Sequence, residues 1–396
     1  MTQLLHVLRG SPRDERSGRP VTGEPQPRWQ ALVKVSKLSL RPAAIAVLSR
    51  VGVLLVAGAV SQVAKQPLRV SLVDWDSKWY VAAAAGYPHH LLPGRGNSAQ
   101  SQLGFFPMLP LLIRLVHIVL TTDYARSGLL VTFATSITAA VAVWWMLRDT
   151  EGPDGASRGT AMVLFSPGAF TMSMVYSEGL LITVMAGCFM ALRRKRWVTA
   201  GALAAVASAT DPLGTMAIVP CAVVAWKAIR RDGESRSLAA PLLAPVGVLG
   251  FFAFLWAWVG TPFAWFIAQR RGWQGGVPGA SIPGVFSWLY DHGFSDINDT
   301  VKAFSAITVA VLLVLLIRSR PETILLAYVV AVLAFSAASP VIGWTPRVAL
   351  RAFPLLAVLG ARAPKSWFGP IVGVSGLVMA ALAVVSWGNG IIPFTP

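Results

Sequence analysis

The chain has 396 residues, of which 55% are hydrophobic and only 13% are charged, and its mean hydropathy is +0.61. A soluble domain carries about 25% charged residues, so this composition excludes an ordinary soluble fold. The formal net charge of +17 comes from short Lys and Arg clusters between long apolar runs. Such clusters follow the positive-inside rule and do not form a nucleic-acid-binding surface. The sequence therefore predicts an all-α polytopic membrane protein that does not bind nucleic acid.

The segment before the first apolar run, residues 1–40, is polar, basic and contains proline. We expect a largely disordered cytoplasmic tail, with 29–37 as a candidate membrane-surface segment, and a single transmembrane domain over 41–396. The two cysteines, Cys188 and Cys221, both lie in apolar runs. We therefore expect buried thiols rather than a disulfide framework.

Twelve apolar runs follow, at 43–62, 105–120, 127–147, 159–175, 178–192, 197–211, 213–229, 238–259, 301–317, 323–338, 348–361 and 367–387. If every basic cluster between them faces the cytoplasm, one run cannot cross the membrane. The run 105–120 contains Arg114, His117 and two prolines, so we assign it to an interfacial helix. The prediction is a bundle of about eleven transmembrane helices, with outer loops at 63–126 and 260–300.

The polar residues that are unusual in so apolar a chain gather at the predicted outer face. They are Asp74, Asp76, Glu178, Asp211, Arg270, Arg271, Arg347 and Arg351. Charged groups beside lipid are costly, so their concentration predicts a functional site that opens to the extracytoplasmic side. The sequence has no P-loop and no dinucleotide-binding pattern. A substrate of this site must then carry its own activation, or the protein is not an enzyme.

The segment from Asp74 to Tyr80 predicts a short helix over 75–85, which Gly86 ends. Asp74 is placed as its N-cap, with a chemical role as the alternative. Asp76 falls in the first turn, where the helix dipole favours the ionised form that a general base needs. A simple surface carboxylate is the alternative for Asp76.

The aromatic residues near these carboxylates have two interpretations. Trp75, Trp79 and Tyr80 suit either anchoring at the membrane interface or stacking on a sugar. The histidine pair at 89–90 lacks the spacing of a closed metal site, so we expect solvated loop histidines and no bound metal.

Two further carboxylates lie at helix breaks. Glu178 follows Tyr176-Ser177 at an outer turn, where it either caps the next helix or contacts a substrate. Asp211 precedes Pro212 and marks either a helix break at the outer surface or a simple turn.

The arginines of the outer face fall into two pairs. Arg347 and Arg351 share one helix face at a spacing of four residues, and either extend to lipid phosphates or bind an anionic ligand. Arg270 and Arg271 belong to a Gly- and Trp-rich segment that suits a mobile loop over a site.

These residues resemble the motifs of the PIG-V-like mannosyltransferases, which are integral-membrane glycosyltransferases of the GT-C class. The first outer loop carries the resemblance in Trp75-Asp76-Ser77-x-Trp79-Tyr80, Gly86-Tyr87 and Phe105-Phe106-Pro107-x-x-Pro110. Ser166-Pro167 through Tyr176-Ser177-Glu178 is similar to their second motif, and Arg347, Arg351 and Phe353-Pro354 to their C-terminal motif. The likeness runs in the same order from residue 45 to residue 365. It departs from the family at Asp211, where an arginine is common.

The resemblance implies a polyprenyl-phosphate-linked mannose as donor co-substrate, with no metal or other cofactor, and a lipid or glycan acceptor at the outer face of the plasma membrane. Asp76 would be the general base, with Asp74 as the second catalytic candidate. Substrate binding would fall to Trp75, Trp79, Tyr80, Glu178, Arg270, Arg271, Arg347 and Arg351. A single displacement would invert the anomeric centre. A transporter or flippase of lipid-linked sugars is the alternative function, and the departure at Asp211 keeps a non-catalytic subunit open.

Overall fold

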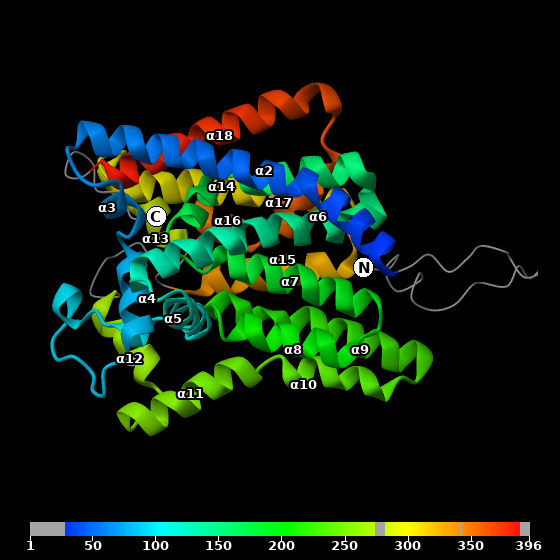
Figure 1. Ribbon diagram of the computed structural model, residues 1–396, viewed down its shortest axis with the longest axis horizontal. Coiled ribbons are helices and arrows are strands. Elements are labelled where there is room, and N and C mark those ends of the chain that lie inside the picture. The colour runs from blue at the N-terminus through cyan, green and yellow to red at the C-terminus, as the bar shows by residue number, and fades with distance from the viewer. Residues whose placement is uncertain (1–27, 274–281, 340–342, 389–396) are drawn as a thin grey trace, which may run out of the picture.

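The computed structural model describes residues 28–273, 282–339 and 343–388 (Figure 1). Every regular element in these ranges is a helix, which confirms the all-α prediction. Their bounds are α2 Arg28–Val63, α3 Leu68–Leu72, α4 Asp76–Ala85, η1 Gly96–Ala99, η2 Gln102–Gly104, α5 Met108–Leu120, α6 Tyr124–Leu164, η3 Pro167–Ser173, α7 Glu178–Arg193, α8 Trp197–Ser208, η4 Pro212–Ala217, α9 Ile218–Asp232, η5 Ser235–Leu238, α10 Ala239–Leu243, α11 Val246–Val259, α12 Ala264–Gly272, α13 Ile282–His292, α14 Ile297–Arg318, α15 Thr323–Ala338, α16 Pro346–Arg351, α17 Pro354–Arg362 and α18 Lys365–Trp387.

Two sequence predictions need correction. Residues 28–40 are helical rather than disordered, because α2 begins at Arg28 and continues through them, including the candidate surface segment 29–37. Once the apolar span of α2 is helical, each further residue added to the helix costs little free energy, because only the first turn of a helix has to be nucleated. The tail before residue 28 lies outside the described residues. In the second outer loop, Arg270 and Arg271 belong to α12 rather than to a loop, whereas 274–281 again lies outside the described residues.

The membrane-type helices form the body of the molecule. In the described part of the chain, six stretches are long and apolar enough to cross a membrane: Leu38–Val63, Tyr124–Leu164, Pro212–Asp232, Ser235–Val259, Ile297–Arg318 and Lys365–Trp387. The pair η3 and α7, bent by 106°, makes a seventh if it counts as one span. The helices α5, α8 and α15 are apolar but shorter. The structure therefore supports a helical membrane protein, and the number of about eleven spans stays a prediction.

The helix α6, which extends over 124–164, contains a sharp break at Gly152. Gly152 has φ 71° and ψ 171° inside it, which is not helical backbone. The segments on either side of the break lie against each other, because Trp144 Nε1 donates to Ser157 Oγ at 3.1 Å. The predicted runs 127–147 and 159–175 therefore both contribute to α6 while remaining separate helices.

The basic clusters of the sequence meet at one end of the bundle. Ion pairs join the links between helices there: Arg193 with Glu322 at 2.5 Å, Lys195 with Asp232 at 2.7 Å and Arg362 with Glu151 at 2.6 Å. Figure 1 shows the start of α2 and the links α7–α8 and α9–α10 at this end. We call it the basic end of the molecule.

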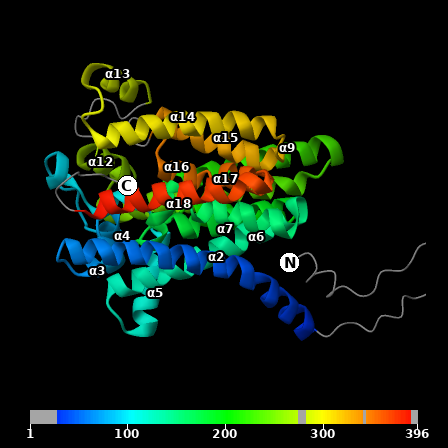
Figure 2. The same cartoon turned by 90° about the horizontal axis from the view of Figure 1, so that it is seen from above.

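The helices α3, α4, α5 and α12 lie at the opposite end, where α18 also finishes (Figure 1). Of these, α5 runs across the direction of the long helices, as the second view shows (Figure 2). Its residues Leu111, Leu115 and Ile118 are more than half exposed. Both features agree with the interfacial helix predicted for 105–120.

The two cysteines confirm the prediction of buried thiols. Cys188 of α7 and Cys221 of α9 have no exposed surface and form no disulfide, and their sulfur atoms lie 4.0 Å apart. Both belong to the main hydrophobic core.

Candidate functional site

Four segments that are far apart in the sequence converge near the end opposite the basic end. The start of α4 supplies Asp76, the break between η3 and α7 supplies Glu178, the start of η4 supplies Asp211, and α16 supplies Arg347 and Arg351. Ion pairs and hydrogen bonds connect all five side chains. We call these five residues the charged cluster. The structure thus brings together most of the charged residues that the sequence singled out.

Arg347 lies between two carboxylates. Its Nη1 is 2.9 Å from Asp76 Oδ2, and its Nε donates to Glu178 Oε1 at 2.7 Å. The guanidinium also lies over the ring of Tyr176, 4.4 Å from the ring centroid, which suits a cation–π contact. Arg347 is therefore held from three sides, and it fixes the position of the Asp76 carboxylate.

Arg351 extends the same arrangement one helical turn further along α16. Its Nη2 lies 3.2 Å from Glu178 Oε1 and 2.9 Å from Asp211 Oδ2. The spacing of four residues places both arginines on one face of α16, as predicted. Of the two alternatives for this pair, extension to lipid phosphates does not agree with the structure, because only 11% and 12% of the two side chains is exposed. A buried carboxylate needs a cationic partner, and Glu178 pairs with both Arg347 and Arg351.

Glu178 is the centre of the charged cluster. It is the first residue of α7 and has no exposed surface. Its carboxylate contacts both arginines, so it does more than cap a helix. Asp211 lies at a helix break, as one of its two interpretations expected, and it also has a partner that the sequence did not predict. It caps η4 by accepting from Leu213 N at 2.9 Å, and it pairs with Arg351.

Two separate sets of hydrogen bonds from neutral side chains also reach residues of the charged cluster. The backbone N–H of Asp76 donates to Tyr176 Oη at 3.2 Å. Tyr80 Oη donates to Ser177 Oγ at 3.1 Å, and Ser177 Oγ donates to Asp211 Oδ2 at 3.2 Å. Burial raises the pKa of the Tyr80 phenol above its ordinary value, and the charge of Asp211 acts in the same direction. Tyr80 therefore stays protonated and keeps its donor role.

Asp76 differs from the other carboxylates of the charged cluster in its access to solvent. About 30% of its side chain is exposed, against 0% for Glu178 and 1% for Asp211. Its Oδ2 faces Arg347, and among the described residues its Oδ1 meets no hydrogen-bond donor. Asp76 is thus the most exposed carboxylate of the charged cluster.

The predicted cap at Asp74 is wrong, although the helix itself is confirmed. α4 begins at Asp76, its N-cap is Trp75, and no side chain caps it. Trp75 has φ 53° and ψ −127°, a conformation that a non-glycine residue rarely adopts. Asp74 Oδ1 accepts the Trp75 N–H at 2.7 Å instead of reaching into the helix. The strained turn at Trp75 therefore sets the direction of Asp76.

The aromatic residues of the opening segment pack against other elements. Trp75 Nε1 donates to Ser386 O at 3.1 Å. Trp79 stacks on Phe105 at 6.4 Å between ring centroids and meets the edge of Trp273 at 5.9 Å. Sequence reasoning did not single out Trp273, and only its position beside the predicted arginine pair pointed to it. The three rings form a partly buried aromatic wall near α4.

Arg270 and Arg271 do not join the charged cluster. Both are exposed on α12. Arg271 Nη1 donates to the carbonyl oxygen of Leu92 at 3.4 Å, which ties α12 to the first outer loop. In the part of the chain that the structure describes, neither arginine pairs with Asp76, Glu178 or Asp211.

Histidine and carboxylate positions give no metal site within the described ranges, where no three candidate ligands gather. The ring of His89 stacks on Trp258 at 4.0 Å between centroids. Tyr176 and Ser177, which contact the charged cluster, were noted in the sequence only as part of a motif. Their contribution depends on tertiary contacts that local patterns do not reveal.

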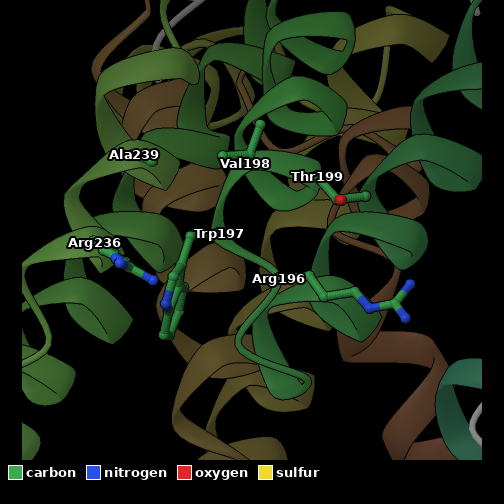
Figure 3. Close-up of a pocket in the computed structure, with 6 residues that line it drawn as sticks. All are labelled: Arg196, Trp197, Val198, Thr199, Arg236 and Ala239. Atoms are coloured by element: carbon green, nitrogen blue, oxygen red, sulfur yellow. The ribbon is translucent and has the colours of Figure 1, made fainter. Parts of the chain in front are cut away.

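A cavity of about 560 Å³ lies at the basic end, beside Trp197 and Arg236 (Figure 3). Arg196 also lines it, but Figure 3 shows its side chain pointing away from Arg236. The two guanidinium groups therefore do not converge on one anion. None of the residues that line this cavity belongs to the charged cluster.

Comparison of the chain with known proteins does not show its family: it matches no model of a protein family and no curated protein.

Proposed function

We propose that the chain is a membrane glycosyltransferase that moves a mannosyl or related hexosyl residue from a polyprenyl-phosphate donor to a lipid or glycan acceptor. One observation carries the proposal. Asp76 is held by Arg347 through one oxygen while its other oxygen stays open, and the buried partners Glu178 and Asp211 fix this arrangement. A preorganised carboxylate at the edge of a membrane bundle suits a general base.

The proposed reaction is a single displacement. Asp76 Oδ1 accepts the proton of the acceptor hydroxyl as the hydroxyl oxygen forms a bond to the anomeric carbon. The bond between that carbon and the phosphate oxygen breaks, and polyprenyl phosphate leaves with the bonding electron pair. Attack opposite to the leaving phosphate inverts the anomeric centre. The donor supplies the driving force, so the reaction needs no nucleotide.

The arginines have a positioning role in this proposal. Arg347 orients the Asp76 carboxylate, and its positive charge would lie beside the developing negative charge of the phosphate. Arg351 is enclosed by Glu178 and Asp211 and holds those two in place. Neither Arg270 nor Arg271 pairs with a residue of the charged cluster in the described chain, so this proposal gives them no substrate-binding role. The site of reaction is the outer face of the plasma membrane, as the resemblance to the PIG-V-like family implies.

The test is a transfer assay in membranes with radiolabelled polyprenyl-phosphate mannose. Asp76→Asn is expected to lower the rate by about 10²–10⁴-fold, which is the usual contribution of a general base. Asp74→Asn is the matched control two residues away, because the asparagine oxygen can still accept the Trp75 N–H. Equal loss in both variants would refute the assignment of the base to Asp76.

The assay also separates transfer from transport. Donor-dependent labelled product that disappears with Asp76→Asn supports the enzyme. Proteoliposomes in which the donor crosses the bilayer without any product, equally in both variants, would establish a flippase instead.

A further inference from the structure

The cavity at the basic end contains a cation that no carboxylate neutralises. Arg236 of η5 lines this cavity and is exposed. Within the described residues its guanidinium forms no hydrogen bond and no ion pair. Its side chain extends toward Trp197, whereas that of Arg196 points away (Figure 3). The N–H groups of Arg236 can therefore donate to a ligand that enters the cavity beside Trp197.

The carboxylates that follow α9 are already engaged by other groups. Glu234 Oε1 accepts from Trp197 Nε1 at 2.8 Å, and Glu234 Oε2 lies 3.2 Å from Lys195 Nζ. Asp232 lies 2.7 Å from the same ammonium group. These contacts hold Glu234 and Asp232 against Lys195, so the counter-charge for Arg236 has to come from a ligand.

The region around the cavity has a large excess of positive charge. The segments 193–196 and 227–236, which an ion pair joins, contain eight Lys and Arg residues and only two carboxylates. A third carboxylate, Glu322, comes from another part of the chain and pairs with Arg193. Such an excess on one surface attracts anions and raises their local concentration.

An apolar surface begins at the same cavity and follows the membrane-type helices. Val198 and Ala239 line the cavity, and 64% of Val198 is exposed. Figure 1 shows α10 and α11 along one outer side of the bundle. Their candidate span exposes apolar residues at helical spacing, which are Leu238, Leu242, Val246 and Leu249. The cationic cavity is therefore continuous with a surface that suits acyl chains.

Close packing behind the cavity prevents α10 from moving inward to fill it. A Cβ added to Gly201 of α8 would lie 2.9 Å from Ala239 O and 2.7 Å from Leu243 Cβ. The two helices are already in contact at this point. The volume beside Arg236 thus stays open to a ligand.

We infer that this cavity binds an anionic phospholipid, with the phosphodiester on Arg236 beside Trp197 and one acyl chain along Val198 and Leu242. A guanidinium donates well to phosphate oxygens, and these hydrogen bonds are charge-assisted. Basic pockets beside membrane helices bind such head groups at the cytoplasmic face, which is the side expected for the basic end. A free phosphate or an acidic peptide would leave Leu242, which is 70% exposed, uncovered.

The test is photo-crosslinking of the purified full-length chain in phosphatidylcholine nanodiscs, with a phosphatidylglycerol that carries a diazirine on one acyl chain. Trypsin cuts after Arg196 and Lys227, so crosslinks are expected in the peptide 197–227, which contains Val198. A phosphatidylcholine with the same diazirine measures contact with the surrounding bilayer. The phosphatidylglycerol probe should label this peptide more strongly than the phosphatidylcholine probe does.

Two arginine variants separate the cavity from the general charge of the basic end. Arg236→Gln should lower the labelling by the phosphatidylglycerol probe about tenfold, because charge-assisted hydrogen bonds to the phosphodiester are lost. Arg231→Gln is the matched control, because it removes an equal exposed charge outside the cavity lining and should label as the wild type does. Equal loss in both variants would overturn the assignment of the head group to Arg236.

Competitors identify the class of ligand in the wild-type chain. Unlabelled phosphatidylglycerol should abolish the excess labelling, whereas glycerol 3-phosphate and a glutamate-rich peptide should leave it unchanged. Displacement by glycerol 3-phosphate would make this a site for soluble anions, and displacement by the peptide would make it a docking site for an acidic protein segment. Either result, or equal labelling by the two lipid probes, would overturn the inference. None of these readouts requires sugar transfer.

Discussion

The buried charges near Glu178 depend on one another. Three carboxylates face two arginines within the charged cluster, and every carboxylate contacts at least one of them. Removing one partner of a buried pair leaves the other charge without compensation, and this costs more than the pair itself contributes. Glu178 contacts both arginines, so its loss has the widest effect.

We therefore expect Glu178→Gln to destabilise the protein by about 3–5 kcal/mol, because Arg347 and Arg351 both lose a buried counter-charge. The measurement is the apparent melting temperature in detergent, followed by fluorescence-detected size exclusion. Asp154→Asn removes an exposed partner of Arg41, 3.7 Å away, and serves as the control that should not move the transition. Equal melting temperatures for wild type and Glu178→Gln would show that Glu178 is not ionised in the folded state.

Close packing between two short helices places Arg347. A Cβ added to Gly168 of η3 would lie 2.4 Å from Pro346 O at the start of α16. No side chain fits there without moving one of the two backbones. The absence of a side chain at Gly168 thus sets the distance between the η3–α7 break and α16, and with it the reach of Arg347 to Asp76.

Gly168→Ala should accordingly displace α16 and lower the transfer rate, by about 100-fold if the shift reaches 1 Å. The variant should remain folded, because a shift of the short helix α16 can relieve the overlap where η3 and α16 meet. Gly250→Ala in α11 adds a Cβ with nothing within 4 Å and is the matched control. Wild-type transfer by Gly168→Ala would show that the position of α16 does not control the rate.

Local patterns predicted the elements of the site better than their contacts. The helix of Asp76, its end at Gly86, the break before Glu178 and the shared face of Arg347 and Arg351 all follow from residue spacing. The pairing of α16 with α4 and α7 does not, because it joins segments separated by most of the chain. A pattern cannot distinguish an arginine that extends to lipid from one that meets a buried glutamate.

The turn before α4 shows a second limit of local reasoning. Residue preferences favour Asp74 as a helix cap, yet the tertiary contact of Trp75 with Ser386 O accompanies a positive φ that moves the helix start to Asp76. The number of about eleven spans stays a prediction. Six helices of the described chain, or seven with the bent pair η3 and α7, are long and apolar enough to cross a membrane.

At the scale of the whole molecule, charge divides the protein into two ends. Exposed ion pairs such as Lys195 with Asp232 lie at the basic end, whereas the charged cluster is enclosed near the other. From the positive-inside rule we expect the basic end to face the cytoplasm. A polyprenyl-phosphate donor used at the outer face then requires the charged cluster to lie on the extracytoplasmic side.

Cysteine labelling tests this orientation directly. Asn97→Cys in η1 and Lys195→Cys at the basic end are both exposed, and Cys188→Ala and Cys221→Ala remove the native thiols. A membrane-impermeant maleimide should label position 97 in intact cells and position 195 only after permeabilisation, because the bilayer separates the two ends. Labelling of both variants after permeabilisation is the control for thiol access. Labelling of position 195 alone in intact cells would place Asp76 at the cytoplasmic face, and transfer from an outward-facing polyprenyl donor could not occur there.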